Sequence, residues 1–383
     1  MKIMHIMLGA FYIDNYSYQE NLLPKYHKKA GHEVEIVASL YTFDENGKGA
    51  WLPKATKYMN EHDIPVTRLA FTKSKFASRI RRYVGLMDEL ERFNPDVLFI
   101  HGVQFCDIDI IVKYLKKHKN VKVYADNHAD FSNSARNWIS KNIQHRIMWR
   151  RCAQKINPYV TKFYGVLPAR VDFLINEYKL PAEKVELLVM GADDEAVIAA
   201  DTKESKLALR EKYGIADDDF LIMYGGKTDN YKKQTMLLMD AVNQIDNPKL
   251  KLIIFGSVIP ELKEEIEKRC SDRVQYIGWV LATDSYQYFA AADLAVFPGR
   301  HSVFWEQVAG QGIPLLVKRW DGTTHVDCGG NVKFLTQDST EEIKAAIEEI
   351  LDGDNYEKML ASAKKASSEF MYSEIAKRSI SAE

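Results

Sequence analysis

Residues 294–318 read LAVFPGRHSVFWEQVAGQGIPLLVK. An apolar run over 294–297 is followed by a helical pattern over 303–310 and by a second apolar run over 314–318. Two short apolar runs joined by a helix predict parallel strands with a crossover helix between them. This unit therefore predicts an α/β fold.

The same alternation recurs throughout the chain. Further strands are predicted over 2–8, 33–39, 96–101, 121–125, 220–224, 250–255 and 274–276, and further helices over 18–30, 83–93, 109–117, 233–244, 260–270, 285–291 and 340–351. We expect two doubly wound, Rossmann-like domains that face a central cleft, over residues 1–195 and 196–366. A last helix at about 367–383 is expected to pack back on the first domain.

The composition sets the class of protein. The chain has 383 residues, of which 46% are hydrophobic and 27% charged, and a formal net charge of −1. These values are ordinary for a globular protein with a full core. No run approaches the ~18 apolar residues of a membrane-spanning helix. None of the four cysteines forms a C-x-x-C pair, which excludes a zinc ribbon.

The net charge conceals two oppositely charged halves. Residues 1–165 hold 26 Lys and Arg against 16 Asp and Glu, whereas residues 166–383 hold 26 against 37. The basic half contains a cluster at Lys73, Lys75, Arg79, Arg81 and Arg82, and a second at Arg150 and Arg151 near Trp138 and Trp149. Basic residues mixed with aromatics indicate an anionic membrane or a phosphorylated acceptor. A solvated basic face is the alternative. No RNA-binding signature is present, so no nucleic-acid partner is expected.

Ligands of doubly wound sheets bind at the carboxyl ends of strands, so the residues after each strand are the candidates. After the first strand, Gly9 would let a ligand approach the backbone, and a polar loop leads through Tyr18 to Glu20 at a helix start. A plain turn is the alternative for this segment.

A polar group of residues follows the run over 121–125. It consists of Asp126, Asn127, His128 and Asp130. The His128 imidazole can donate to a hydroxyl or phosphate, with the carboxylates orienting it. A solvated loop with a helix cap is the alternative. We interpret this group as an acceptor-side site.

The second half carries a basic glycine turn and a polar helix start. Gly226 and Lys227 follow the strand over 220–224, with Lys232 and Lys233 behind them; such lysines can neutralise a diphosphate. A surface turn is the alternative. Within the opening stretch, Gly299, His301 and Ser302 precede the helix, with Ser302 as its expected N-cap, and these groups favour an anion.

Glu306 lies one turn into that helix, among apolar residues. A carboxylate there needs a partner, for which a sugar hydroxyl is suitable. A salt bridge to a neighbouring lysine is the alternative.

Together these residues resemble a GT-B glycosyltransferase of the retaining family 4, of the bacterial surface-polysaccharide type. Gly31-His32-Glu33-Val34 is similar to the family's GHEV, and Val189-Met190-Gly191-Ala192-Asp193 is similar to its PNGVD segment. Ile277-Gly278-Trp279-Val280 is similar to its LGxV, near the nucleotide base. The stretch over 306–314 is similar to the family's EAMACGLP, whose glutamate binds the nucleotide ribose. The resemblance covers nearly the whole chain.

The resemblance assigns expected roles. His128 matches the family's active-site histidine beside the transferred sugar, Lys227 stands where the family has an arginine, and Lys232 or Lys233 where it has the lysine that binds the diphosphate. One departure is Pro298, where the family has a second glutamate that contacts the donor sugar. His301 and Ser302 are the expected substitutes.

The implied function is transfer of a hexose-type sugar, with retention, from a nucleotide diphosphate sugar, most simply a UDP-sugar. The acceptor would be a saccharide or a polyprenyl-diphosphate-linked saccharide. With no D-x-D motif, no metal or cofactor is expected, and the lysines would stabilise the leaving group. The implied location is cytoplasmic, peripheral on the inner face of the cell membrane. A nucleotide-sugar 2-epimerase of the same fold and a non-catalytic nucleotide-sugar-binding subunit are the alternatives.

Overall fold

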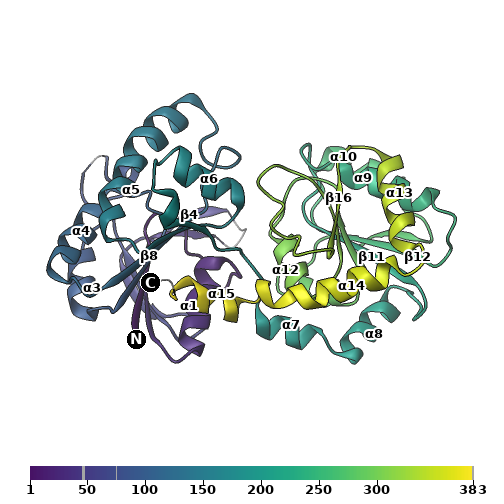
Figure 1. The fold of residues 1–383 in the computed structure, drawn as a ribbon, viewed down its shortest axis with the longest axis horizontal. Helices are drawn as coiled ribbons and strands as arrows, with labels where there is room; N and C mark the ends of the chain where they lie inside the picture. The colour runs from purple at the N-terminus through teal and green to yellow at the C-terminus, as the bar shows by residue number, and fades with distance from the viewer. Residues whose placement is uncertain (45–47, 75, 382–383) are drawn as a thin grey trace. The chain divides into compact units, whose positions relative to one another are not determined.

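The computed structural model describes residues 1–44, 48–74 and 76–381, which form two compact units (Figure 1). Unit 1 comprises Met1–Val189 and Ser373–Glu383, and unit 2 comprises Met190–Tyr372. The sequence places the boundary at 195/196 and the return of the chain at 367. The structure places these two points at 189/190 and 372/373.

Unit 1 contains an eight-stranded sheet in the order β10-β9-β8-β7-β1-β2-β6-β5. Its parallel strands are β1 (Lys2–Met7), β2 (Glu33–Ser39), β6 (Pro65–Leu69), β7 (Val97–His101), β8 (Lys122–Asn127), β9 (Lys162–Gly165) and β10 (Val185–Leu187). Apolar runs buried on both faces are typical of such central strands. β5 (Thr56–Met59) pairs antiparallel with β6, and β3 (Tyr41–Phe43) and β4 (Gly49–Trp51) form a separate hairpin.

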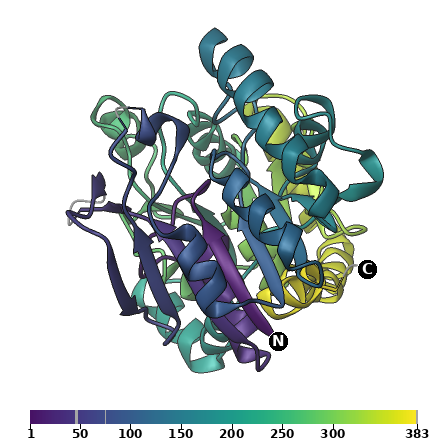
Figure 2. The same ribbon diagram turned by 90° about the vertical axis from the view of Figure 1, so that its left-hand side faces the viewer.

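Helices cover the sheet of unit 1 (Figures 1 and 2). They are α1 (Gln19–Lys29), α2 (Ala77–Ile80), α3 (Leu86–Phe93), α4 (Ile108–Lys117), the π-helix η1 (Ser140–Trp149), α5 (Arg150–Ile156), η2 (Asn157–Tyr159), α6 (Pro168–Asn176), η3 (Ala182–Lys184) and α15 (Tyr372–Ser379). Gly31, with φ +83°, ends α1 as predicted. α15 lies beside α1, so the expected return of the last helix to the first unit is confirmed.

Unit 2 contains a six-stranded parallel sheet in the order β13-β12-β11-β14-β15-β16. Its strands are β11 (Phe220–Gly225), β12 (Leu250–Phe255), β13 (Val274–Tyr276), β14 (Leu294–Phe297), β15 (Leu315–Lys318) and β16 (Val332–Leu335). Its helices are α7 (Asp194–Ala200), α8 (Lys203–Lys212), α9 (Gln234–Gln244), α10 (Pro260–Glu267), α11 (Ser285–Ala290), α12 (Phe304–Gly310), α13 (Thr340–Leu351), α14 (Asn355–Ala366) and η4 (Ser367–Phe370). The Ser339 hydroxyl accepts from the Glu342 amide and caps α13.

The prediction of two doubly wound α/β units is confirmed. Two local expectations differ from the structure. Asp126 and Asn127 belong to strand β8 and not to the loop after it. α12 begins at Phe304 with Val303 in the cap position, so Ser302 is not its N-cap; the Ser302 hydroxyl accepts only weakly, at 3.5 Å, from the Phe304 amide.

Candidate functional site

Glycines allow two loops of unit 1 to meet at the carboxyl edge of its sheet. β1 and β7 are parallel neighbours, so the loops that follow them leave the same edge. A Cβ on Gly9 would lie 2.1 Å from the Gly102 carbonyl oxygen. Only glycine fits there, and its role in the structure is this close loop packing.

His128 lies beside two carboxylates at this edge. Its Nε2 is 3.5 Å from Asp126 Oδ2 and 3.9 Å from Glu20 Oε1, and 27% of its side chain is exposed. Gln19 Nε2 donates to the same Asp126 oxygen at 3.1 Å. Thus α1 supplies Glu20 and Gln19, and β8 supplies Asp126.

These neighbours change the acidity of both groups. Burial opposes the charge on Asp126, but His101 and His128 outweigh it and hold the pKa of this carboxyl well below its usual range. Burial also opposes the charge on His128, but Glu20 and Asp126 outweigh it and raise the pKa of the imidazole. The surroundings of His128 therefore favour its protonated form, which can donate a hydrogen bond to a ligand.

The other predicted acceptor-side residues have different surroundings. Asn127 is buried; its side chain accepts from Gln104 Nε2 at 2.8 Å and donates to the Ala129 carbonyl at 2.9 Å. Asp130 is buried and pairs with Arg170 at 3.2 Å. Tyr18 is 41% exposed at the start of α1. Of these three residues, Tyr18 is the one whose side chain is exposed to a ligand.

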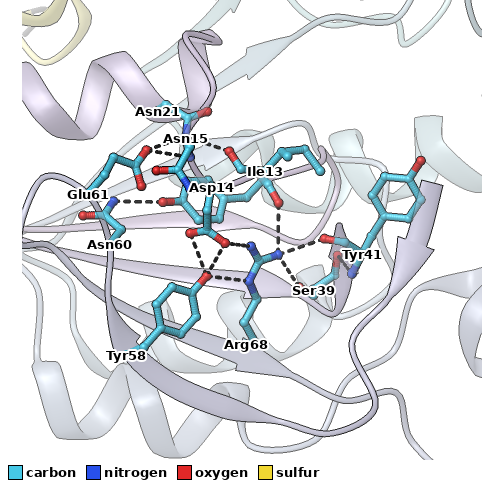
Figure 3. Close-up of polar contacts among 11 residues, drawn as sticks. Ile13, Asp14, Asn15, Asn21, Ser39, Tyr41, Tyr58, Asn60, Glu61 and Arg68 are labelled. Atoms are coloured by element: carbon cyan, nitrogen blue, oxygen red, sulfur yellow. Dashed lines mark hydrogen bonds and ion pairs between the residues drawn. The ribbon is translucent and has the colours of Figure 1, made fainter. Parts of the chain in front are cut away.

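A buried arginine fixes the loop between β1 and α1 (Figure 3). Arg68 is fully buried, and its guanidinium pairs with Asp14 at 2.7 Å. It also donates to the carbonyls of Tyr12, Ser39 and Tyr41 at 2.8–3.0 Å. Since Tyr12 follows β1, Ser39 ends β2 and Tyr41 begins β3, one side chain holds these three places of the chain together.

The predicted basic surface divides into exposed and internal residues. Lys73, Arg79 and Arg151 are exposed, and Lys75 lies outside the described residues. The rest are engaged inside unit 1: Arg81 donates to the carbonyls of Gly9 and Gln104, Arg82 pairs with Asp107 and Asp109, and Arg150 donates to the Glu177 carbonyl. Arg81 thus supports the Gly9 loop.

In unit 2, glycines also bring together the turns after neighbouring strands. Gly226 follows β11 with φ +141°, and a Cβ on Gly256 would lie 2.0 Å from its carbonyl oxygen. The Gly256 amide donates to the Gly278 carbonyl at 2.7 Å. These three turns therefore lie side by side at the carboxyl edge of the sheet.

The predicted lysines and aromatics surround these turns. Lys227 is 59% exposed, 3.7 Å from Asp229. Burial lowers the pKa of Lys232, although Asp229 opposes this, and Lys233 is exposed just before α9. Trp279 is 68% exposed. The Gly299 carbonyl accepts from Trp320 Nε1 at 3.3 Å.

Glu306 is held by two histidines. Its Oε1 lies 2.7 Å from His301 Nε2 and 2.8 Å from His325 Nε2. Burial opposes its charge, but the two imidazoles outweigh it and lower its pKa to about 2. Its Oε2 is buried without a hydrogen-bond partner in the described part of the chain. The two histidines satisfy Oε1, so it needs neither a sugar hydroxyl nor a lysine, and Oε2 is left without a partner among the described residues.

His325 was not predicted from the sequence. It lies in the segment between β15 and β16, so the rule of examining residues after each strand would have found it. His301, Glu306 and His325 also have the composition of a metal site, with ligand atoms within 4.8 Å of one another. Metal-binding histidines donate their second N–H to an acceptor. His325 Nδ1 has no such acceptor among the described residues, which favours a hydrogen-bonded carboxylate.

Comparisons with known proteins place this geometry in context. Residues 219–353 match the family model described as Glycosyl transferases group 1. No curated protein sequence matches the chain. None of the described helices is both long and apolar enough to span a membrane.

Solved structures match nearly the whole chain. HepE from Anabaena in complex with UDP superposes with a TM-score of 0.66 at 16% identity, over 99% of this chain and 98% of that one. A glycosyltransferase from Rickettsia africae gives 0.66 at 14%, over 98% and 96%. UDP-GlcNAc 2-epimerase from Neisseria meningitidis, bound to UDP-GlcNAc, gives 0.61 at 14%, over 99% and 98%. The chain therefore has the GT-B fold of these proteins, with two Rossmann-like domains and a group 1 glycosyltransferase match in the second.

Proposed function

We propose that this chain is a retaining glycosyltransferase that moves a hexose-type sugar from a UDP-sugar to a saccharide or polyprenyl-diphosphate-linked saccharide in surface-polysaccharide assembly. The observation that carries the proposal is Glu306, with one oxygen held by two histidines and the other buried without a protein partner among the described residues. A carboxylate oxygen only accepts hydrogen bonds, so a ribose hydroxyl suits it. Glu306 also lies within the matched segment.

Unit 2 would hold the donor diphosphate near its glycine turns. Gly226, a partly buried glycine with φ +141°, permits close approach of a ligand to the backbone, and Lys227, Lys232 and Lys233 supply positive charge. Burial lowers the pKa of Lys232, and a neighbouring diphosphate would raise it again. As the bond to the sugar breaks, these charges would stabilise the departing diphosphate. The proposal assigns this role to the lysines and needs no cofactor or metal.

Unit 1 would supply the groups that act on the sugar and the acceptor. A cationic His128 donates a hydrogen bond to a sugar hydroxyl, while Asp126 and Glu20 fix its orientation. In retaining transfer of the expected kind, the acceptor attacks from the face of the leaving group and gives its proton to the departing phosphate. His128 would thus be a positioning donor, not a nucleophile.

We also propose that unit 1 contacts an anionic membrane on the cytoplasmic side. Trp138, Ile139, Ile143 and Ile147 lie on or just before η1 and are 46–70% exposed. Exposed apolar residues at a four-residue spacing, near basic Arg151, are typical of a helix that lies in a membrane interface. Vesicle binding should weaken in Ile143→Glu, whereas Ile198→Glu, which changes an isoleucine 71% exposed in unit 2, should leave it unchanged. Equal binding by both variants would contradict the membrane proposal.

A nucleotide-sugar 2-epimerase is the second candidate function. It is supported by the likeness to the UDP-GlcNAc 2-epimerase from Neisseria meningitidis over 99% of this chain. Such an enzyme would use the nucleotide site of unit 2 without an acceptor.

One experiment separates these functions. The protein is incubated with UDP-, GDP-, TDP- and ADP-sugars, with and without a lipid-linked saccharide extract. Nucleotide release and the sugar products are followed by NMR. Transfer predicts acceptor-dependent release of UDP and a linkage with the donor's anomeric configuration. A 2-epimer of intact nucleotide sugar would identify an epimerase, and nucleotide binding without any turnover would reject both enzymes.

A further inference from the structure

A line of three buried imidazoles crosses unit 1 and ends at the candidate site. His27 lies on α1, His5 on the central strand β1 and His101 at the end of β7. All three are at most 1% exposed, and none is part of the proposed chemistry. The end of α15, which is the last helix of the chain, lies at the far end of this line (Figure 1).

Each ring lies within hydrogen-bonding distance of the next. His27 Nδ1 is 3.0 Å from His5 Nε2, and His5 Nδ1 is 2.9 Å from His101 Nε2. His101 Nδ1 is 2.8 Å from Asp126 Oδ2, the oxygen that also faces His128. At the other end, His27 Nε2 is 3.1 Å from the Ser379 hydroxyl. The contacts are continuous from α15 to the carboxylate beside His128.

The two ends of the line set the direction of its protons. An ionised Asp126 only accepts, so the proton facing it belongs to His101 Nδ1. At the other end the Ser379 hydroxyl donates to the Ala376 carbonyl at 2.7 Å, and this carbonyl only accepts, so His27 Nε2 donates to it. A neutral ring carries one N–H, so His27 Nδ1 accepts from His5 Nε2, and His5 Nδ1 accepts from His101 Nε2.

The surroundings favour neutral rings at His5 and His27. Burial, together with His27 and His101, lowers the pKa of His5 well below its ordinary value. Burial lowers the pKa of His27 to about 3, with the Ala376 carbonyl opposing and His32 adding to the effect. His5 and His27 therefore each carry a single proton at neutral pH. Bonds in such a series polarise one another, so a change at one end alters the strength of the bond at the other.

We propose that His101, His5 and His27 are positioning residues that act on His128 through Asp126, as one proton-ordered relay that runs from Asp126 to α15. The relay strengthens the hydrogen bond to the Asp126 carboxylate and so sets how tightly that carboxylate holds the proton of His128. This deepens the role given to His128 in the proposed function. The charged groups that face His128 directly are Asp126 from β8, Glu20 from α1 and Arg170 from α6.

The test is the titration of His128 in the full chain, labelled with ¹³C-histidine and assigned with the variant His128→Gln. In His101→Phe the deprotonated Asp126–His128 pair loses a donor, so the pKa of His128 should rise by about one to two pH units. In His5→Phe the donor to Asp126 remains but is weaker, so the rise should be a few tenths of a unit. His145→Gln is the matched control, because His145 is equally buried but bonded to Ser134 and Tyr178, outside the relay.

The outcomes are separable. If His101→Phe and His5→Phe lower the melting temperature as His145→Gln does but leave the His128 titration unchanged, the residues are only structural and the proposal falls. If His101→Phe does not fold, the smaller shift in His5→Phe or in His101→Asn decides the matter. The titration needs no substrate. A shifted His128 in a protein without transferase activity would support the relay and reject the proposed function.

Discussion

Replacing Glu306 by Gln tests whether two histidines hold a buried charge in unit 2. The pKa of Glu306 is about 2 against an ordinary 4.5, a difference that corresponds to about 3 kcal/mol of folding free energy at neutral pH. Because the folded-state pKa is depressed, this stability is fully present above pH ~4.5 and is lost as the pH falls toward 2. Gln resembles the protonated acid in volume and in its hydrogen bonds.

The expected result is a pH-dependent gap between the two proteins. Glu306→Gln should be less stable than wild type by about 3 kcal/mol near pH ~6, and by only about 1 kcal/mol near pH ~3. Urea unfolding measures this gap. The transition that shifts to higher urea when UDP is added is the one assigned to unit 2. The matched control is Glu264→Gln, whose carboxylate is 80% exposed beside Lys268, and it should leave the midpoint unchanged.

A gap that is small and constant with pH would refute the reasoning, because it would mean that the Glu306 carboxylate carries no stabilised charge. The same variant should also weaken UDP binding by about tenfold or more, because the free oxygen Oε2 becomes an amide nitrogen that cannot accept a hydrogen bond. Unchanged UDP affinity would separate the role of Glu306 in stability from a role in binding.

Three other changes follow from the geometry. Arg68→Met should destabilise unit 1 by about 3 kcal/mol or more in thermal or chemical unfolding, because it removes the cation beside Asp14 and the donor to three carbonyl groups; a loss below 1 kcal/mol would show that water replaces the guanidinium. Gly256→Ala should reduce the thermal shift produced by UDP, since its Cβ would lie 2.0 Å from the Gly226 carbonyl oxygen at a φ of +122°; an unchanged shift would show that the turns do not touch the nucleotide. The rate of the wild type should fall on the alkaline side as His128 loses its proton above its raised pKa, and His128→Gln should be slower and lack that limb of the pH profile.

Local pattern in the sequence accounts for most of the fold. The runs that became β1, β2, β7, β11, β12 and β14 are mostly apolar and end at Gly, Pro or polar residues, so strand identity follows from neighbouring residues alone. The stop of α1 at Gly31 and the cap of α13 at Ser339 are equally local. The short strands β9, β10 and β16, of three or four residues, were not predicted.

The candidate site was predicted in part. The rule that ligands bind at the carboxyl ends of strands selected His128, Gly226 and Glu306 from the order of elements alone. The rule did not reveal which of the predicted residues form hydrogen bonds to other groups of the protein and not to a ligand. Arg81 donates to the Gly9 carbonyl, and Asn127 accepts from Gln104. Both are residue types that are common on surfaces and in ligand-binding sites.

The sequence by itself determined the alternation of strands and helices, the ends of several elements and the glycine turns, because each depends on residues close together in the chain. Only the tertiary structure decided which polar groups meet. His101 faces Asp126 because β7 pairs with β8 in that register, and His5 reaches His101 because β1 lies on the other side of β7. His325 meets Glu306 through the path of a loop. Strand order and register bring residues together across long separations, and no local pattern encodes them.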